Sequence, residues 1–162
     1  MPKKRILIVD ADVASRNFIA RKLYDANYDV IQAGSGKEGL ICSWRDRPDL
    51  VVVDPTIADL SGEEFASKLR NDARTAQIPL IALSSDPNIT RSKSCLEAGF
   101  TEYIIKSGQA VPLLNDALAR LLGLSEEVMK KGGLSMVFLS AKGGTGTSSM
   151  CANIAMNIAE NL

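Results

Sequence analysis

Short, unbroken runs of apolar residues, separated by stretches with a helical period, dominate the first 124 residues of the chain. The run at 50–53 shows no alternation with polar residues, which is typical of a strand buried on both faces, as in a parallel sheet covered by helices. Further predicted strands lie at 6–9, 28–32, 79–83 and 103–105. Helical spacing of apolar residues predicts helices between the strands, at 12–26, 37–47, 60–73, 89–98 and 109–122.

Alternation of five predicted strands with five predicted helices indicates the fold class. It is typical of an α/β protein in which helices cover both faces of a parallel sheet. Because crossover connections are right-handed, we expect a flavodoxin-like (βα)5 doubly wound sheet with the strand order 2-1-3-4-5. The fold also allows a small-ligand domain of the flavodoxin kind, but Asp10-Ala11-Asp12 stands where such a domain needs a glycine loop.

Four predicted strands end on a chemically active side chain, namely Asp10, Asp54, Ser84 and Lys106. The carboxyl ends of parallel strands lie at one edge of the sheet, where α/β proteins place their ligand sites. A carboxylate nucleophile, a second acid for Mg²⁺, a hydroxyl and an ammonium are the groups that phosphoryl transfer to a carboxylate needs. The structural alternatives are a turn cap for Asp54, a backbone-bonded hydroxyl for Ser84 and an ion pair of Lys106 with Asp54.

The amino-acid composition limits the kinds of partner and ligand that we expect. Lys+Arg and Asp+Glu are equal at 19 each, so the net charge is zero and we expect no nucleic acid as a partner. No histidine is present, so a metal would have to be a hard ion such as Mg²⁺ held by oxygens. No apolar stretch reaches the ~20 residues of a membrane span, and we expect no membrane insertion. Cys42, Cys95 and Cys151 are widely spaced, which favours reduced thiols and a cytoplasmic location.

The strand-end motifs resemble the receiver domain of two-component response regulators (CheY-like) over about residues 3–124. The motifs are Ile-Leu-Ile-Val-Asp10, Pro-Asp-Leu-Val-Val-Val-Asp54, a downstream Gly62, Ile-Pro-Leu-Ile-Ala-Leu-Ser84 and Tyr103-Ile-Ile-Lys106. The intervals between Asp54, Ser84 and Lys106 also match the family. We therefore expect domain boundaries at 1–124 for a receiver domain and 125–133 for a linker.

The resemblance also implies roles for individual residues. Asp54 would be the phosphoacceptor, Ser84 the hydroxyl that moves toward the phosphate, and Lys106 the ammonium beside it. Tyr103 would be a rotating aromatic switch, with plain core packing as the alternative. Mg²⁺ would be held by Asp10, Asp54 and the backbone carbonyl of Thr56.

Three departures from the family pattern concern the same site. The family has two adjacent acids after the first strand, whereas here Ala11 follows Asp10, and Asp12 is the candidate replacement one position later. Loss of a carboxylate weakens a small Mg²⁺ site. Ser107 and Ala58 stand where the family usually has proline, and Ser107 places the family's cis peptide in doubt.

The last part of the chain predicts a second, different element. An apolar run at 134–139 leads into a glycine-rich loop and then into a helical stretch, which is the context of a phosphate-cradling loop. The loop resembles the deviant Walker A motif of ParA/MinD-type P-loop ATPases, and ATP would be its ligand. Its candidate binding residues are Lys142, Gly143, Gly144, Gly146, Thr147 and Ser148. Thr147 replaces the usual second lysine, and a flexible turn is the alternative interpretation. We expect 134–162 to be the N-terminal strand–P-loop–helix fragment of such a domain.

A receiver followed by such an ATPase resembles the TadZ/CpaE family, which localises and assists the assembly of Flp pili, often at a cell pole. The implied partners are a histidine kinase, pilus assembly proteins and a second copy bound through the fourth helix, fifth strand and fifth helix. Three hypotheses follow: a receiver phosphorylated on Asp54, a pseudo-receiver that dimerises and localises without phosphate chemistry, and an ATPase whose activity needs more than residues 134–162. We favour a receiver acting through protein contacts.

Overall fold

The computed structural model describes residues 2–124, in which strands and helices alternate. The strands are β1 (Arg5–Val9), β2 (Asp29–Ala33), β3 (Leu50–Val53), β4 (Leu80–Ser84) and β5 (Glu102–Ile105). The helices are α1 (Val13–Asp25), α2 (Gly36–Asp46), α3 (Gly62–Arg70), α4 (Ile89–Ala98) and α5 (Ala110–Leu121). The predicted strand fragment, loop and helix at 134–162, and the linker at 125–133, lie outside the described residues.

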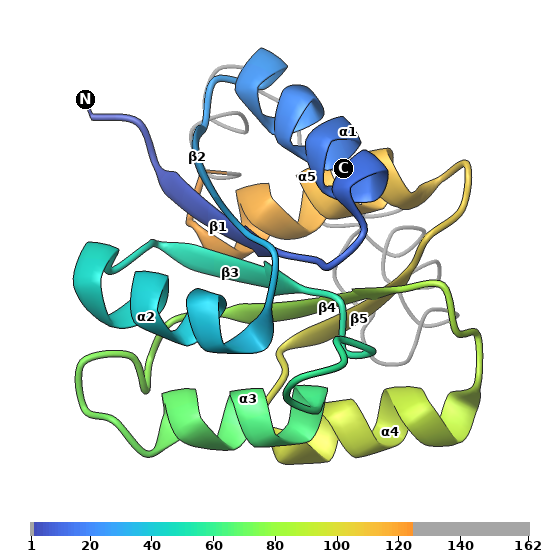
Figure 1. Ribbon diagram of the computed structural model, residues 1–162. Helices are drawn as coiled ribbons and strands as arrows, with labels where there is room; N and C mark the ends of the chain where they lie inside the picture. Colours follow the sequence, from blue (N-terminus) through green and yellow to red (C-terminus); the bar gives the residue numbers. More distant parts are fainter. Residues whose placement is uncertain (1, 125–162) are drawn as a thin grey trace, which may run out of the picture. The chain divides into compact units, whose positions relative to one another are not determined.

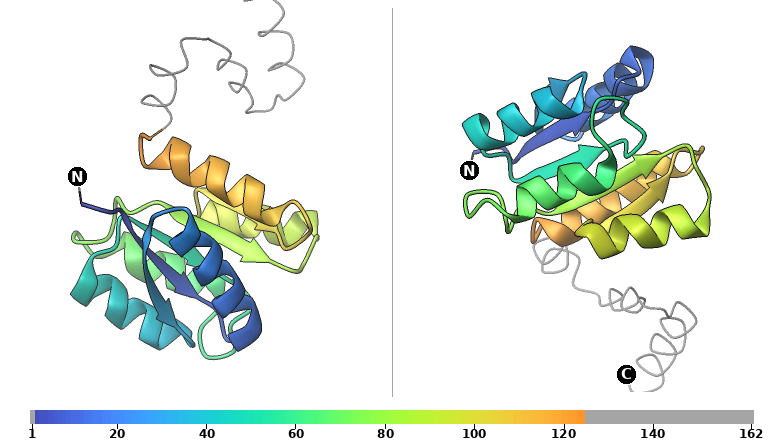
Figure 2. Two further views of the ribbon diagram at one scale, coloured as in Figure 1. Left: turned by 90° about the horizontal axis from the view of Figure 1, so that it is seen from above. Right: turned by 60° about the horizontal axis from the view of Figure 1, so that its bottom comes forward.

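The strands form one parallel sheet in the order β2-β1-β3-β4-β5. Helices α1 and α5 cover one face of this sheet, and α2, α3 and α4 cover the other (Figure 1, Figure 2). The predicted flavodoxin-like fold and its strand order are therefore confirmed.

The central strands are buried on both faces, as their unbroken apolar runs predict. Every residue of β3 and β4 is buried, and so are four of the five residues of β1. Phe65 of α3, with no exposed surface, packs in the core cluster together with strand residues such as Leu7 and Val53. Because protein interiors of this kind are close-packed, the strand ends that carry the candidate site have fixed positions.

Capping residues set the helix ends. Ser61 and Glu64 form a reciprocal capping box at the start of α3, and Gly99 ends α4 with a φ of 121°. Helix α3 ends at Arg70, three residues before the predicted end at about residue 73. The physical reason is the turn that follows, in which the carbonyl of Asp72 accepts hydrogen bonds from the N–H groups of Thr75 and Ala76.

Of the described residues, those up to Leu122 belong to one compact unit. Within residues 2–124, none of the helices combines the length and the apolar character that crossing a bilayer requires.

Candidate functional site

The register of the sheet brings the predicted strand-end residues together. Val9 of β1 pairs with Val53 of β3, so the residues that follow them, Asp10 and Asp54, leave the sheet side by side. The N–H of Asp54 donates to the carbonyl of Val9 at 2.9 Å, which continues the ladder into the site. Between the ends of β4 and β5, the N–H of Lys106 donates to the carbonyl of Ser84 at 2.7 Å.

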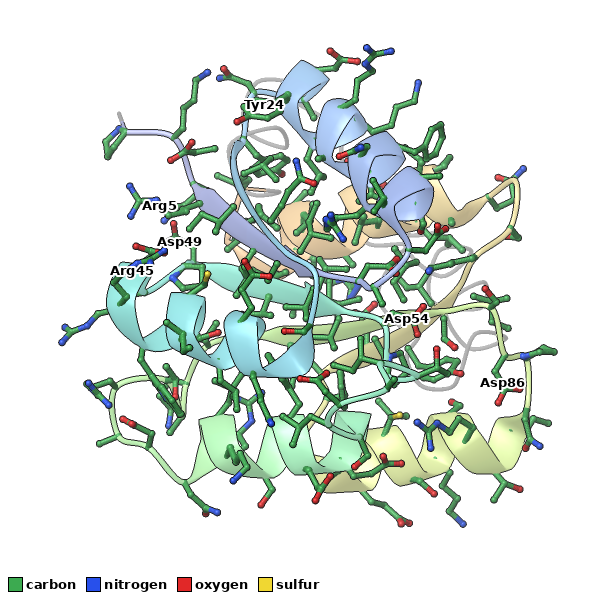
Figure 3. The ribbon with its side chains drawn as sticks, in the orientation of Figure 1. Arg5, Tyr24, Arg45, Asp49, Asp54 and Asp86 are labelled. Atoms are coloured by element: carbon green, nitrogen blue, oxygen red, sulfur yellow. The ribbon has the colours of Figure 1, made fainter. Side chains whose placement is uncertain are left out.

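Figure 3 shows where this edge lies in the molecule. Asp54 and Asp86 are both at the carboxyl edge of the sheet, whereas Arg5, Arg45 and Asp49 are at the opposite edge. At that opposite edge, Arg5 donates its backbone N–H to Asp49 at 2.7 Å, which fastens β1 to the start of β3. The labelled charged groups at that edge therefore have structural partners.

Lys106 is the centre of the site because its ammonium binds both acids. Its Nζ lies 2.8 Å from Oδ2 of Asp10 and 2.8 Å from Oδ2 of Asp54. The side chains of Lys106, Asp10 and Asp54 are only 20%, 7% and 12% exposed, so water screens this group weakly. The ion pair of Lys106 with Asp54, one of the two expected interpretations, is present, and Asp10 joins it.

The contacts of Asp54 set its charge state. Burial on its own would raise the pKa of this carboxyl, but the hydrogen bonds from Lys106 and Thr56 bring the pKa below its ordinary value. Burial would lower the pKa of Lys106, and the two carboxylates raise it above its ordinary value instead. At neutral pH the site therefore holds a lysine cation between carboxylates, and Asp54 is an anion.

Thr56 engages the other oxygen of the candidate phosphoacceptor. Its backbone N–H and its hydroxyl both donate to Oδ1 of Asp54, at 2.9 and 2.6 Å. The carbonyl of Thr56 accepts no hydrogen bond within the described residues. That oxygen is thus available as the metal ligand that the family resemblance assigns to it.

Asp12 does not join the other two acids. Its side chain caps helix α1 by accepting from the N–H of Ser15 at 3.2 Å, and its own N–H donates to Oδ1 of Asp10 at 2.9 Å. Within residues 2–124 no group of three or more acidic, histidine or cysteine side chains is arranged to hold a metal. Asp12 thus serves as a helix cap through Oδ2 in this arrangement, and its replacement of the acid missing at Ala11 stays a prediction. The donors that fit Mg²⁺ are Asp10, Asp54 and the Thr56 carbonyl.

Ser84 and Tyr103 bind the loop between β4 and α4 rather than Asp54. The Ser84 hydroxyl, fully buried, accepts from the N–H of Asp86 at 3.1 Å. The Tyr103 hydroxyl donates to the carbonyl of Asp86 at 2.7 Å, and burial raises the pKa of this phenol. Both side chains therefore fix the same residue of this loop, and neither hydrogen-bonds to Asp54 in the described structure. The peptide between Lys106 and Ser107 is trans.

Two residues with contacts near Asp54 were not predicted from the sequence. Asp59 binds the N–H groups of Gly36 and Lys37 at 2.8 and 2.9 Å, which fastens the loop after β3 to the start of α2. Arg91 of α4 donates to the carbonyl of Pro55 at 2.7 Å. Neither residue lies at a strand end or in a motif, so the sequence carried no signal for them.

The P-loop candidates at Lys142, Gly143, Gly144, Gly146, Thr147 and Ser148 lie outside the described residues. The candidate site of the described domain is therefore the group around Asp54.

Relatives of this chain are regulators and kinases. A two-component response regulator of Oryza sativa is 29% identical over 106 residues, which are 65% of this chain and 81% of that protein. A DNA-binding transcriptional regulator of Synechocystis is 29% identical over 141 residues, which are 82% of this chain and 58% of that protein. The chain covers less than half of some relatives: it spans 43% of a probable transcriptional regulator of Porphyridium aerugineum, at 32% identity over 106 residues.

Solved structures share the fold. The receiver domain of a sensor histidine kinase from Pseudomonas aeruginosa superposes with a TM-score of 0.70 at 24% identity, over 75% of this chain and 99% of that one. A CheY-like receiver domain protein from Methanospirillum hungatei gives a TM-score of 0.68 at 27% identity, over 78% of this chain and 99% of that one.

The family model for the response regulator receiver domain matches residues 6–117, which include all five strands except the first residue of β1. The matched stretch also contains Ser84 and the three residues that the geometry brings together, Asp10, Asp54 and Lys106. The chain therefore belongs to the response regulator receiver domain family of two-component signalling.

Proposed function

We propose that this receiver domain is a phospho-switch in which Asp54 is the phosphoacceptor and protein contacts carry the output. The observation that supports it most strongly is the convergence of Asp54, Asp10 and Lys106, with Nζ of Lys106 at 2.8 Å from both carboxylates. Asp54 is ionised at neutral pH and is thus able to act as a nucleophile.

In the proposed step, Asp54 is the nucleophile and an external phosphodonor supplies the phosphoryl group. A carboxylate oxygen of Asp54 attacks the phosphorus of a phosphodonor, the bond from phosphorus to the leaving group breaks, and its electron pair departs with that group. Lys106 then moves one of its hydrogen bonds from the carboxylate to a phosphoryl oxygen, which neutralises part of the added charge. Ser84 would donate its O–H to a phosphoryl oxygen, and because its oxygen also accepts from the N–H of Asp86, it links the loop between β4 and α4 to the site.

Mg²⁺ is the cofactor that we assign to this site. The receiver structure from Pseudomonas aeruginosa is described with a magnesium ion in its active-site cleft. Here Asp10, Asp54 and the Thr56 carbonyl would hold the ion, which would neutralise charge on the phosphoryl oxygens. Since Ala11 supplies no carboxylate and Asp12 caps α1, we propose a weaker Mg²⁺ site than three acids would make.

A histidine kinase is the partner class that we propose as phosphodonor. One relative, 33% identical over 104 residues, is a histidine kinase of Formosa agariphila, although those residues are 8% of that protein. For self-association we propose the face of α4, β5 and α5. Ile89 and Leu96 of α4 are 82% and 44% exposed, Ile105 of β5 is 40% exposed and Leu113 of α5 is 50% exposed, so apolar area is available there.

The attached domain defines the wider role. We propose that residues 134–162 begin a ParA/MinD-type ATPase and that the full protein is a TadZ/CpaE-like factor of pilus assembly, acting in the cytoplasm at a cell pole. The support is the motif Lys142-Gly-Gly-Thr-Gly-Thr147-Ser148 after an apolar run. Equilibrium dialysis of the full-length protein with ATP, beside Lys142→Ala, tests this proposal, and equal binding by both would contradict it.

Intact-mass spectrometry tests the phospho-switch. The chain is incubated with acetyl phosphate and Mg²⁺, and the Asp54→Asn variant is treated in parallel. We expect a phosphoryl adduct on the wild-type chain that peptide mapping places on Asp54, and none on the variant. An adduct of equal yield on both chains would contradict the assignment of Asp54.

A pseudo-receiver is the second candidate, and a particular observation favours it. The ammonium of Lys106 already bonds to both carboxylates that would hold a metal ion, and Ala11 supplies no carboxylate as a further metal ligand. In that case the domain localises and dimerises without phosphate. Absence of any adduct, with a known receiver labelled beside it, would support this candidate over the phospho-switch.

A further inference from the structure

We infer that Arg91 ties helix α4 to the loop that follows Asp54, so that a change in the Asp54 carboxylate itself reaches α4 mainly through this side chain. The inference concerns how the site is connected to the rest of the domain, and it holds whether or not Asp54 is phosphorylated. Arg91 is thus a positioning residue that makes no contact with Asp54 itself.

The contacts of Arg91 span three elements. Its Nη2 donates to the carbonyl of Pro55 at 2.7 Å, and Pro55 directly follows Asp54. Its Nη1 lies 3.2 Å from Oε1 of Glu63 in the first turn of α3. The side chains of Arg91 and Glu63 are 29% and 32% exposed, so this pair is partly shielded from water. One guanidinium therefore joins α4, α3 and the residue next to Asp54.

Close contacts within the loop between β3 and α3 restrict independent movement of Pro55. The carbonyl of Pro55 also accepts the N–H of Gly62 at 3.2 Å, which closes the loop on itself. A Cβ at Gly62 would stand only 2.6 Å from Cβ of Pro55, so the two backbones touch. A displacement at Asp54 must then move the acceptor that Arg91 holds.

The guanidinium is also not saturated in this arrangement. Its Nε is buried and has no hydrogen-bond partner among the described residues. A buried unpaired donor is unfavourable, so a position of α4 that supplies an acceptor to Nε would recover part of this free-energy cost. Two arrangements of similar free energy are what a transmitted change requires.

The same loop has a second tether, which serves as an internal comparison. Asp59 binds the N–H groups of Gly36 and Lys37 at the start of α2. That contact leads to α2 and not to α4. If the inference is correct, the two tethers carry changes to different helices.

A double-mutant cycle followed by amide hydrogen exchange and mass spectrometry tests the inference. The full chain is compared as wild type, Asp54→Ala, Arg91→Gln and the double variant. Lys93→Gln, an exposed lysine on the same helix, is the matched control because it removes an equal charge without this link. Asp59→Asn examines the other tether. If Arg91→Gln fails to fold, Arg91→Lys replaces it, since a lysine keeps the charge but has no forked donor to serve both Glu63 and Pro55.

We expect the effects of Asp54→Ala and Arg91→Gln on amide hydrogen exchange in α4 to be non-additive. Asp54→Ala raises exchange in peptides covering Ile89–Ala98 by about threefold or more in the wild-type and Lys93→Gln backgrounds. In the Arg91→Gln background the same substitution leaves α4 nearly unchanged, and Asp59→Asn alters α2 instead. An equal rise in every background, or no rise in the wild type, would overturn the inference. The cycle uses no phosphodonor, so its outcome is separate from that of the acetyl phosphate experiment.

Discussion

Lys106 determines the character of the site at the scale of single residues. Its ammonium lies 2.8 Å from each of two carboxylates that are themselves nearly buried. Removing one partner of a buried ion pair is far more destabilising than the pair is stabilising, because a charge is left without compensation. The ammonium of Lys106 thus neutralises part of the charge of both carboxylates in the described structure.

The pH dependence of stability follows from this arrangement. Because the pKa of Asp54 is lower in the folded chain than in the unfolded chain, its ionised form stabilises the fold above about pH 4. This contribution disappears as the pH falls through the folded-state pKa. We expect the free energy of unfolding of wild type minus that of Asp54→Asn to decrease between about pH 6 and about pH 3, measured by urea denaturation. A difference that stays constant or grows over that range would contradict it.

Asp12 gives a second prediction at this scale. Its carboxylate caps α1, so Asp12→Ala should lower the free energy of unfolding by about 1 kcal/mol. Since we propose Asp10, Asp54 and the Thr56 carbonyl as the Mg²⁺ donors, Mg²⁺ affinity should stay the same in that variant. Urea denaturation and a Mg²⁺ titration measure the two quantities. A variant with full stability and weakened Mg²⁺ binding would show that Asp12 is a metal ligand after all.

The residues at strand ends were predictable, and so was the pair of Lys106 with Asp54, whereas the roles of Asp12 and Arg91 were not. A buried strand that ends on an acid places the acid at the edge of the sheet whatever the side chains around it do, which is why Asp10, Asp54 and Lys106 could be named. The use of Asp12 depends on whether a helix begins at the next residue, and an Asp before a helix serves as a cap more readily than as a ligand. Arg91 needed the packing of two helices to be known.

The loop between β3 and α3 is the decisive element. It begins at the phosphoacceptor candidate, touches itself at Pro55 and Gly62, and is tethered to two helices. Its shape is set by close backbone approach rather than by unusual dihedral angles, since Gly62 has no positive φ.

Gly62 is accordingly the residue to substitute in this element. In Gly62→Ala the new Cβ would lie 2.9 Å from the Cα of Pro55, a backbone atom that cannot turn away. We expect a loss of about 1–3 kcal/mol in the free energy of unfolding and a slower reaction of Asp54 with acetyl phosphate. Gly108→Ala is the matched control, because no atom lies within 4 Å of its Cβ position. Equal stability of the two variants would contradict the close approach.

Elements were predicted well where the pattern and the cap agree. Helix α4 was placed at 89–98, as observed, because apolar spacing and Gly99 indicate the same end. Helix α3 was predicted three residues too long, because its end depends on a turn around Asp72 that the apolar pattern does not reveal.

At the scale of the whole molecule, the described residues contain everything that the family fold requires. The family model ends at residue 117, and the compact unit ends at Leu122. The topology could be predicted because right-handed crossovers leave few alternatives for alternating strands and helices. Residues 125–162 remain a sequence-based prediction.

A truncated chain tests the independence of this unit. We expect residues 1–124 to unfold cooperatively with a Tm within about 2 °C of the longer chain, since the core lies within β1–β5 and α1–α5. Differential scanning calorimetry measures both. A truncated chain without a cooperative transition would show that the tail completes the fold.

We propose that the receiver site is present and that Ala11 weakens its binding of Mg²⁺. The most direct measurement is the rate of Asp54 labelling by acetyl phosphate as a function of Mg²⁺ concentration, in wild type and in Ala11→Asp, with Asp54→Asn as the blank. Restoring the adjacent acid should lower the Mg²⁺ concentration at half-maximal rate by about tenfold or more, with the adduct on Asp54 in both chains. No Asp54-dependent adduct in either chain, or the same Mg²⁺ dependence in both, would contradict the account.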